Sequence, residues 1–517
     1  MGIPSYFSFI MKNYKNIIKK RKDIPEIDHL CMDCNSMIYD SFYELEKKYN
    51  NKPFDISTIE QLLIISVIEK IEALVYEIQP KKTFFITFDG VAPFAKMNQQ
   101  RKRRYKSSFM TKIPSFDILS NREKETPIWN TTFITPGTAF METLSDTINK
   151  YFKNKESKYL CDNINISCSD EVGEGEHKIY QWIRNTSLND DTVAVYGLDS
   201  DLIMLSIFHK QFTKNIYVFR EAPNFRNVVE EVVIKEEKEK LFMDIEQLSL
   251  CIFSEMGLGK VYDNRRVYDY IFICFLLGND FLPHIVSLNI RTIGIQVILD
   301  TYKYSIGNHM DRSLIHPISK EIQWNYVGLF IKELSKKEHQ NILQEHKLRD
   351  KFDYKVWSTL TDKKTIDQLI ENTPVIYRTD EKYISPKEDG WQSRYYQVLF
   401  DIEPVNTEIY SICENYIEGL AWIFQYYTEG VRNNQWNYRY HYAPLLEDLK
   451  KYIGKVDIKT VYEDKKGYTK EEQLRYVIPN DLLVKIFPED ATISKEVKSY
   501  QLKWAYCRYL WEAHPVL

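Results

Sequence analysis

The sequence predicts an α/β fold, in which a mainly parallel sheet is flanked by helices and is followed by a mostly helical second region. Short runs of β-branched and aromatic residues alternate with helical stretches through the first 300 residues, as in sheets built from strand–helix–strand units. With 517 residues, the chain is also far longer than one hydrophobic core usually serves, so at least two lobes are expected.

The first predicted strand covers residues 28–33 (DHLCMD), and an amphipathic helix is expected over residues 59–78. Three further strands are predicted from apolar, β-branched runs: residues 83–89 (TFFITFD), 192–199 (TVAVYGLD) and 215–219 (NIYVF). These strands are separated by helical segments, which favours parallel pairing with helices on both faces.

The sequence predicts three parts along the whole chain. Residues 1–300 are predicted to form the α/β domain. Residues 301–390 are polar and irregular, which predicts a connection between lobes. Residues 391–517 are aromatic and helical, most clearly from Thr407 to the segment YRYHYAP that ends at Pro444.

Composition excludes several classes of protein. Hydrophobic residues make up 44% of the chain and aromatic residues 14%, which is typical of globular rather than disordered proteins. The net charge of −4 argues against a general polyanion binder, so any contact with nucleic acid has to come from a local basic patch. The longest apolar run, Tyr270–Leu277, is much shorter than the roughly 20 residues of a membrane helix. We therefore expect a soluble, intracellular protein with no membrane contact.

Cys31 and Cys34 form the only CxxC among eight cysteines. A structural zinc site needs a second pair of ligands at short range, and none follows in the sequence. We expect both to be buried thiols.

Carboxylates stand where the predicted strands end. Asp33, Asp89 and Asp199 each close an apolar strand, and the carboxyl edge of a parallel sheet is where ligands bind. Asp201 follows Asp199 within one turn, in GLDSDLIML. A single aspartate of this kind is often a helix cap or turn residue, but three strand ends in succession favour a shared site.

Three further acids stand in glycine-containing segments: Glu174 and Glu176 in VGEGEHK, and Asp280 in LLGNDFLPH. Each segment alone can be read as a turn or loop. Seven acids at one edge would repel one another strongly unless cations neutralise them. Oxygen ligands without a His/Cys set indicate Mg²⁺ or Mn²⁺, and two such ions are a known device for attack on a phosphodiester.

A concentrated basic segment follows Asp89. Residues 95–106 read AKMNQQRKRRYK, and no acid occurs between Asp89 and Asp117. The basic residues in this interval are Lys96, Arg101, Lys102, Arg103, Arg104, Lys106 and Lys112. The segment alone is compatible with a nuclear-import signal, a solvated helix face or an anion-binding pocket.

Taken together, these motifs resemble the eukaryotic 5′→3′ exoribonuclease family. The resemblance rests on MGIPSYFSFI, DGVAPFAKMNQQRKRRYK, ITPGTAFM, GEGEHKI, YGLDSDLIML and GNDFLPH, and later on WQSRYYQVLF, YIEGLAWIFQYY and YRYHYAP. The motifs occur in family order and cover about residues 1–300 and 390–445. The resemblance implies a nuclease fold related to flap endonucleases and PIN domains. It also implies processive release of nucleoside 5′-monophosphates from RNA with a 5′-monophosphate.

The resemblance assigns roles residue by residue. The catalytic metal ligands would be Asp33, Asp89, Glu174, Glu176, Asp199, Asp201 and Asp280, and they would hold two Mg²⁺ or Mn²⁺ ions. The 5′-phosphate pocket would be formed by Lys96, Gln100, Arg103 and Arg104. Side-chain amides and guanidinium groups bind a terminal phosphate with directional hydrogen bonds, whereas an import signal needs only charge. We therefore favour the pocket.

The sequence departs from the family at two aromatic positions. Tyr39 stands where the family has a histidine that stacks on the terminal base, and any aromatic face can serve this purpose. In the late aromatic motif only Trp436 remains of two tryptophans, and Asn434 and Arg439 occupy altered positions. We expect Tyr39 and Trp436 to stack on or enclose RNA; the alternative for each is ordinary aromatic core.

The expected protein is a minimal form of the family, as a virus or a reduced genome would encode. We expect a monomeric, cytoplasmic or nuclear enzyme of RNA decay that acts on single-stranded RNA and works with the decapping machinery. Two alternatives stay open. A flap-type structure-specific DNA nuclease would share the acids. A catalytically silent RNA-binding protein could retain the fold, although such proteins usually lose metal ligands first.

Overall fold

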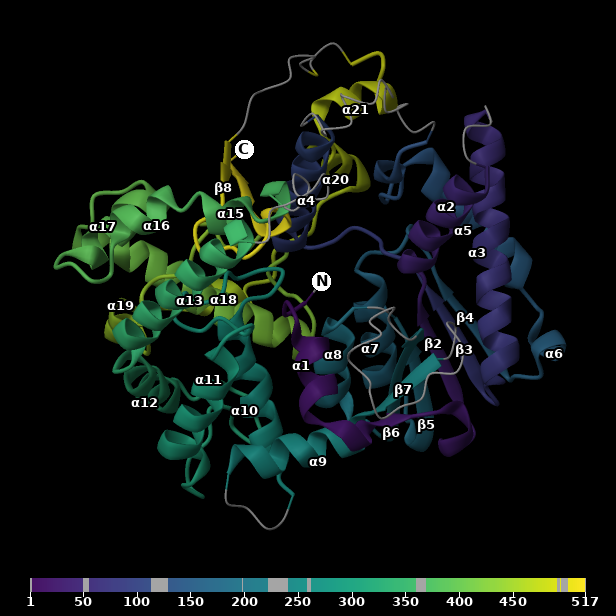
Figure 1. Cartoon of the computed structure of the whole chain (residues 1–517). Helices are drawn as coiled ribbons and strands as arrows, with labels where there is room; N and C mark the ends of the chain where they lie inside the picture. Colours follow the sequence, from purple (N-terminus) through teal and green to yellow (C-terminus); the bar gives the residue numbers. More distant parts are fainter. Residues whose placement is uncertain are drawn as a thin grey trace.

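Figure 1 shows an α/β part beside a helical part. The computed structural model of the chain describes residues 2–49, 55–112, 129–197, 199–221, 240–257, 262–358, 369–490, 493 and 501–516.

A seven-stranded sheet forms the centre of the α/β part, in the order β1-β7-β6-β5-β2-β3-β4. The strands are β1 (Ile18–Lys19), β2 (His29–Asp33), β3 (Thr83–Thr87), β4 (Asn163–Ser167), β5 (Asn189–Tyr196), β6 (Thr213–Glu221) and β7 (Lys240–Asp244). Strands β2 to β6 pair in parallel, whereas β7 is antiparallel to both β6 and β1. The predicted mainly parallel sheet is confirmed.

The four predicted strands correspond to β2, β3, β5 and β6. Two of them end earlier than expected: β3 ends at Thr87 and β5 at Tyr196. Asp89 and Asp199 therefore lie in the loops that follow these strands, where the backbone can turn toward the carboxyl edge. Strands β2, β3 and β5 are direct neighbours in the sheet, so the loops that carry the acids emerge side by side.

Helices cover both faces of this sheet (Figure 1). One face is covered by α2 (Asn35–Tyr49), α3 (Ile56–Ile78), α5 (Ala139–Phe152) and α6 (Glu156–Tyr159), and the other by α1 (Tyr6–Asn13), α7 (Gly175–Asn185), α8 (Asp201–His209) and α9 (Ile245–Met256). The strand alternation divides the core accordingly. Leu30 and Met32 face the first group, whereas Cys31 between them faces the second. Cys31 and Cys34 are buried, unbridged thiols, as expected.

The second part is helical almost throughout. Its helices are α10 (Asn264–Cys274), α11 (Gly294–Tyr302), α12 (Trp324–Ser335), α13 (Glu338–Ser358), α15 (Thr373–Ile376), α16 (Thr379–Ile384), α17 (Trp391–Phe400), α18 (Asn406–Thr428), α19 (Leu446–Tyr452), α20 (Lys470–Val477) and α21 (Asn480–Ile486). The expectation of an irregular connection over residues 301–390 is wrong, because α12, α13, α15 and α16 lie there. Among the described residues, no helix is long and apolar enough to cross a membrane.

Helix α4 (Phe94–Lys112) carries the basic segment and is held by the last part of the chain (Figure 1). On one side it packs on α20 through a small apolar cluster that includes Met97 and Leu474. The Gln473 side chain accepts a hydrogen bond from Ala92 N at 2.9 Å. On another side α4 contacts the C-terminal hairpin of β8 (Gln501–Lys503) and β9 (His514–Val516).

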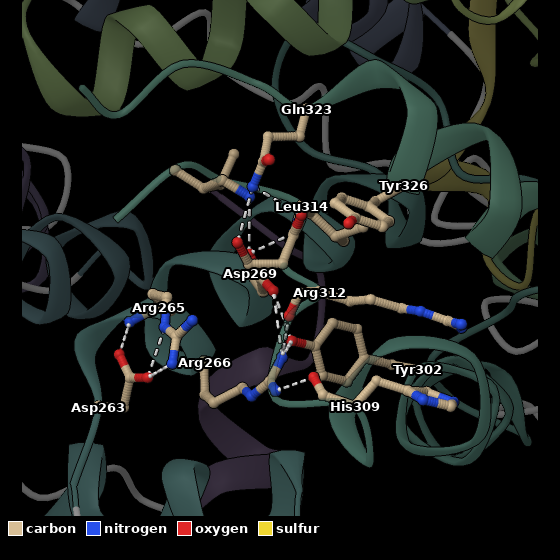
Figure 2. Close-up of polar contacts among 12 residues, drawn as sticks. Asp263, Arg265, Arg266, Asp269, Tyr302, His309, Arg312, Leu314, Gln323 and Tyr326 are labelled. Atoms are coloured by element: carbon tan, nitrogen blue, oxygen red, sulfur yellow. Dashed lines mark hydrogen bonds and ion pairs between the residues drawn. The ribbon is translucent and has the colours of Figure 1, made fainter. Parts of the chain in front are cut away.

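A buried polar network stabilises the helical part (Figure 2). Asp269 on α10 accepts hydrogen bonds from the backbone N–H groups of Leu314 and Ile315, at 2.9 and 2.8 Å, and from the Tyr302 hydroxyl at 2.5 Å. Arg266, one turn earlier, donates to Tyr302 and to two backbone carbonyls. The network thereby ties α10 to α11 and to the segment before α12.

Candidate active site

Four aspartates meet at the carboxyl edge of the sheet. Asp33 is the last residue of β2, Asp89 and Asp199 follow β3 and β5, and Asp201 opens α8. Backbone N–H groups fix their carboxylates: Gly175 N donates to Asp89 Oδ1 at 2.7 Å, and Asp201 N donates to Asp199 Oδ1 at 3.2 Å. The predicted convergence of strand ends is present in the structure.

The segment VGEGEHK brings two glutamates to the same edge. Glu174 immediately precedes α7, and Glu176 lies in its first turn; both are buried. A Cβ atom at Gly175 would lie 2.8 Å from Asp33 Oδ1 and 3.1 Å from Thr87 Oγ1. Only glycine permits this approach of α7 to β2 and β3.

The acids open into a cavity of about 520 Å³. Five of the predicted metal ligands line it: Asp33, Asp89, Glu174, Glu176 and Asp199. The predicted phosphate-binding residues and the predicted stacking residue Tyr39 also line it: Lys96, Gln100, Arg103, Arg104 and Tyr39. The sequence analysis did not assign Ser5, Ser8, Asn35 or Arg220, which also line it. Ser5 and Ser8 belong to the motif MGIPSYFSFI, so the family resemblance of this motif was the signal that could have identified them.

Asp201 and Asp280 complete the acidic cluster from behind this lining. Lys96 Nζ lies 2.7 Å from Glu174 Oε1 and 2.9 Å from Asp280 Oδ2. Lys96 therefore lies between two predicted metal ligands in this structure, at the boundary between the acids and the predicted phosphate pocket. Its role toward a phosphate stays a prediction.

Burial and mutual repulsion dominate the electrostatics of the cluster. Burial, with Asp89 beside it, raises the pKa of Asp33 to about 8. Burial and Asp199 raise the pKa of Asp201 to about 7. The pKa of Glu176 is raised well above its usual value by burial and then by Asp201 and Asp199. These three carboxyl groups thus have raised pKa values although the Lys96 ammonium lies within the cluster.

This donor set fits a hard divalent cation. Its members offer carboxylate oxygens, and potential ligand atoms of Glu174, Glu176 and His177 lie within 4.8 Å of one another. Burial lowers the pKa of His177 well below its usual value, so the imidazole is neutral. Without a cation, some of these carboxyl groups retain protons. Bound divalent cations would replace the protons and remove the repulsion between the carboxylates.

The basic side of α4 forms the other half of the cavity. Gln100 is buried, Arg103 is exposed, and Arg104 is half-buried. Arg104 Nη1 and Nη2 donate to the carbonyls of Thr132 and Ile134 at 3.1 and 3.2 Å, which fixes the guanidinium. Arg104 Nε and Gln100 Oε1 are buried without a hydrogen-bond partner. The guanidinium donors of Arg103 and Arg104 suit a group with phosphate geometry, and Arg103 is the more accessible of the two.

The two predicted stacking residues lie in different environments. Tyr39 on α2 is half-buried and lines the cavity close to Arg104. Trp436 is only 7% exposed and stacks on Trp422, with ring centroids 5.1 Å apart. Most of the Trp436 ring is therefore already covered by protein. This burial favours the alternative prediction, in which Trp436 is part of the aromatic core. Its stacking on RNA has little surface to use in this structure.

Helix α18 adds contacts that the sequence analysis did not predict. The hydroxyl of Tyr426 donates to Glu174 Oε2, and that of Tyr427 donates to Asp201 Oδ1. The His177 ring stacks on Tyr426 with centroids 3.6 Å apart. Tyr426 in turn stacks on Trp422. The motif YIEGLAWIFQYY contains three of these aromatic residues, but no local pattern in it indicates what they touch.

Comparison with known families agrees with this geometry. Residues 1–222 match the family model described as XRN 5′-3′ exonuclease N-terminus. Residues 260–382 and 377–490 match the model described as Xrn1 helical domain. The chain belongs to the XRN 5′-3′ exonuclease family. The family resemblance expected from the motifs is thereby confirmed, and the helical-domain match includes most of the region expected to be a connection.

Curated relatives within the XRN family are similar over most of this chain. Human 5′-3′ exoribonuclease 1 is 27% identical over 93% of this chain. The Drosophila melanogaster 5′-3′ exoribonuclease 2 homolog is 25% identical over 93% of this chain, and Saccharomyces cerevisiae 5′-3′ exoribonuclease 1 is 24% identical over 93% of it. The chain spans 30%, 64% and 39% of the length of these three proteins, respectively.

Proposed function

We propose that the chain is a divalent-metal-dependent 5′→3′ exoribonuclease that degrades 5′-monophosphorylated RNA processively to nucleoside 5′-monophosphates. The observation that carries this proposal is the shared cavity. Its walls are a cluster of buried carboxylates on one side and the amide and guanidinium groups of α4 on the other. Membership of the XRN 5′-3′ exonuclease family supports the direction and the substrate class.

In this proposal the two walls have different tasks. Gln100, Arg103 and Arg104 bind the terminal phosphate, and Tyr39 stacks on the first base. Divalent cations, when bound, supply an activated water and neutralise charge on the phosphodiester. The seven acids would hold these cations: Asp33, Asp89, Glu174, Glu176, Asp199, Asp201 and Asp280.

The amide and guanidinium groups on the α4 side of the cavity support selectivity for the 5′ end. A pocket that contacts a terminal monophosphate on several sides favours it over a capped or triphosphorylated end, for which there is less room. Decapping exposes such a monophosphate end, so we propose that the protein acts in RNA decay after decapping, as a monomer in the cytoplasm.

One assay separates this function from its alternatives. The protein would be incubated with 5′-monophosphate RNA, triphosphate RNA and matched DNA, each with Mg²⁺ or with EDTA. We expect release of mononucleotides from monophosphate RNA alone, and only with Mg²⁺. Preferred cleavage of the matched DNA would favour the flap-type nuclease. Binding of RNA without any hydrolysis would favour the catalytically silent protein.

A further inference from the structure

One hydroxyl group on the cavity wall has no partner within the described part of the chain. Ser36 lies in the first turn of α2, is half-buried and lines the cavity. Its Oγ atom is buried and forms no hydrogen bond with any residue that the structure describes. Among the described residues of the cavity lining, no other hydroxyl group combines burial with the lack of a partner. Because an unpaired buried hydroxyl is unfavourable, Ser36 indicates a partner from outside the chain.

The residue before Ser36 fixes its place beside the acids. Asn35 N donates to Asp33 Oδ1 at 3.4 Å, and Asn35 Oδ1 accepts a hydrogen bond from Asp89 N at 3.2 Å. Asn35 is thus bonded to two of the predicted metal ligands, through its backbone and through its side chain. These two bonds hold the first turn of α2 against the acidic cluster, so Ser36 has a defined position next to it.

Ser36 also lies next to the predicted stacking residue. Tyr39 follows three positions later on α2, so the two side chains are neighbours on one face of the helix, about 4.5 Å apart along its axis. Both line the cavity, and Tyr39 is close to Arg104 of the predicted phosphate pocket. Along this face of α2 the hydroxyl of Ser36 therefore lies between the acids and the aromatic ring.

This order identifies the part of the substrate that Ser36 meets. In the proposed function the first nucleotide has its 5′-phosphate at Arg103 and Arg104, its base on Tyr39 and its scissile bond at the acids. The ribose connects these three groups, so it lies beside the first turn of α2. We propose that the Ser36 hydroxyl hydrogen-bonds the 2′-hydroxyl of the first nucleotide and thereby selects RNA over DNA. This inference rests on the proposed function and adds a residue that determines its sugar specificity.

The hydrogen-bonding capacities of the two hydroxyl groups match. A serine hydroxyl donates one hydrogen bond and accepts others, and a ribose 2′-hydroxyl does the same, so either group can be the donor. When a deoxynucleotide is bound, the Ser36 hydroxyl stays unpaired. A site that bonds a substrate hydroxyl discriminates against the analogue without it for this reason. Ser5 and Ser8 also line the cavity, but both are exposed, so water can satisfy their hydroxyl groups.

Single 2′-deoxy substitutions in the substrate test the proposal. Three 15-mers with a 5′-monophosphate would be compared: all RNA, RNA with a deoxyribose at the first nucleotide, and RNA with a deoxyribose at the sixth. The rate of release of the first mononucleotide would be measured with Mg²⁺ and excess enzyme. For the wild type we expect a rate about tenfold lower when the first sugar is deoxyribose, the value of one hydrogen bond between neutral groups. A deoxyribose at the sixth nucleotide should not change this rate.

Ser36→Ala should reduce this tenfold difference to about twofold or less, mainly by slowing release from the all-RNA substrate. The missing 2′-hydroxyl also changes the leaving group, but that effect is the same for every variant, so the change in the ratio reports the Ser36 contact. Ser41→Ala is the matched control on the same helix. Ser41 lies about 140° around α2 from Ser36, and its Oγ accepts a hydrogen bond from Ser66 Oγ at 2.9 Å. This variant should keep the tenfold difference.

The melting temperature of Ser36→Ala should equal or exceed that of the wild type, because alanine favours the helix and the change breaks no hydrogen bond of the described residues. An unchanged ratio in Ser36→Ala, whether or not both rates fall, would overturn the inference. A wild type that does not distinguish the two sugars at the first nucleotide would overturn it as well. In either case the proposed function stands if the wild type releases mononucleotides from 5′-monophosphate RNA. A wild type that hydrolyses none of the substrates would overturn both.

Discussion

The hydroxyl of Tyr427 lies 2.5 Å from Asp201 Oδ1, although the two residues are 226 positions apart in the sequence. Tyr427 is on α18 in the helical part, and Asp201 opens α8 in the α/β part. The neighbouring Tyr426 makes the equivalent bond to Glu174. The helical part is therefore not only a cover for the sheet. It holds two acids of the candidate active site in position.

We predict that Tyr427→Phe lowers the rate of RNA hydrolysis and the affinity for Mn²⁺ by about 10–100-fold, as for other residues that orient metal ligands. The phenol ring stays in place, so the melting temperature should change little. Titration calorimetry with Mn²⁺ measures the affinity apart from catalysis. Tyr416→Phe on the same helix removes a hydroxyl that donates to Pro283 O, and it should leave Mn²⁺ affinity unchanged.

A second prediction concerns the acids themselves. Asp199→Ala and Asp201→Ala should each abolish hydrolysis at saturating Mg²⁺ while leaving the fold intact. Burial and Asp199 raise the pKa of Asp201 to about 7, so removing either acid relieves repulsion. The melting temperature in EDTA should stay the same or rise. More than a few per cent of wild-type rate in both variants would contradict their assignment as catalytic residues.

Arg103→Ala tests the terminal pocket. The lost charge-assisted hydrogen bonds to phosphate are each worth about 1.5–3 kcal/mol, so kcat/KM on 5′-monophosphate RNA should fall at least tenfold. The loss on 5′-hydroxyl RNA should be much smaller, because that substrate has no terminal phosphate to bind. Arg432→Ala, at an arginine on the loop after α18, is the control. Equal losses on both substrates would reduce Arg103 to a general backbone contact.

A fourth prediction uses the buried network of Figure 2. Burial raises the pKa of Asp269 to about 6, against the effect of its hydrogen bonds. Between pH 4 and 6 the folded state therefore retains a proton that the unfolded state has released, and the contribution of Asp269 to stability falls as pH rises. The free energy of unfolding of the wild type relative to Asp269→Asn should fall over this window and level off above about pH 7. Urea unfolding at pH 4.5, 5.5 and 7.5 measures it. A pH-independent difference would mean that Asp269 is ionised throughout.

Much of the α/β part could be predicted because its signals are local. Buried parallel strands such as β2 and β3 consist of contiguous apolar residues, and this pattern needs no knowledge of the fold. Strand β4 was missed because it reads NINIS at the edge of the sheet, and three of its five residues are polar. The convergence of the acids was predictable because parallel strands end at one edge.

Helices in the second part were not predicted where their sequences are rich in charged residues. Helix α13 looks like a polar connection, yet its Arg349 is 1% exposed and pairs with the fully buried Glu381 at 2.7 Å. A buried ion pair cannot be told from surface charge in a sequence. The same limit applies to Tyr426 and Tyr427, because their contacts depend on how α18 packs on α7 and α8, and no local pattern records that.

The last prediction concerns Tyr39, the departure from the family that faces the cavity. An exonuclease that advances one nucleotide per cycle has to release its product without releasing the RNA. An aromatic face contributes about 1–3 kcal/mol per stacked base and accepts any base. Tyr39 lies on α2, two turns or less from Asp33, and lines the cavity beside Arg104, so a base bound there lies between the acids and the terminal pocket.

If Tyr39 stacks on the first base, Tyr39→Ala should leave Mn²⁺ affinity unchanged and should accumulate partial-length products from a long RNA when each enzyme meets one substrate. Tyr39→His should restore full-length degradation, because the step requires a flat ring rather than a hydroxyl. Thermal unfolding distinguishes the alternative, in which Tyr39 only packs against the hydrophobic core on this face of the sheet. A core role predicts that Tyr39→Ala loses about 3–5 kcal/mol of stability, as other large-to-small aromatic substitutions do. A fully processive Tyr39→Ala, or a loss of that size, would therefore exclude stacking, since a half-buried ring that serves the substrate contributes its face to the RNA and not to the core.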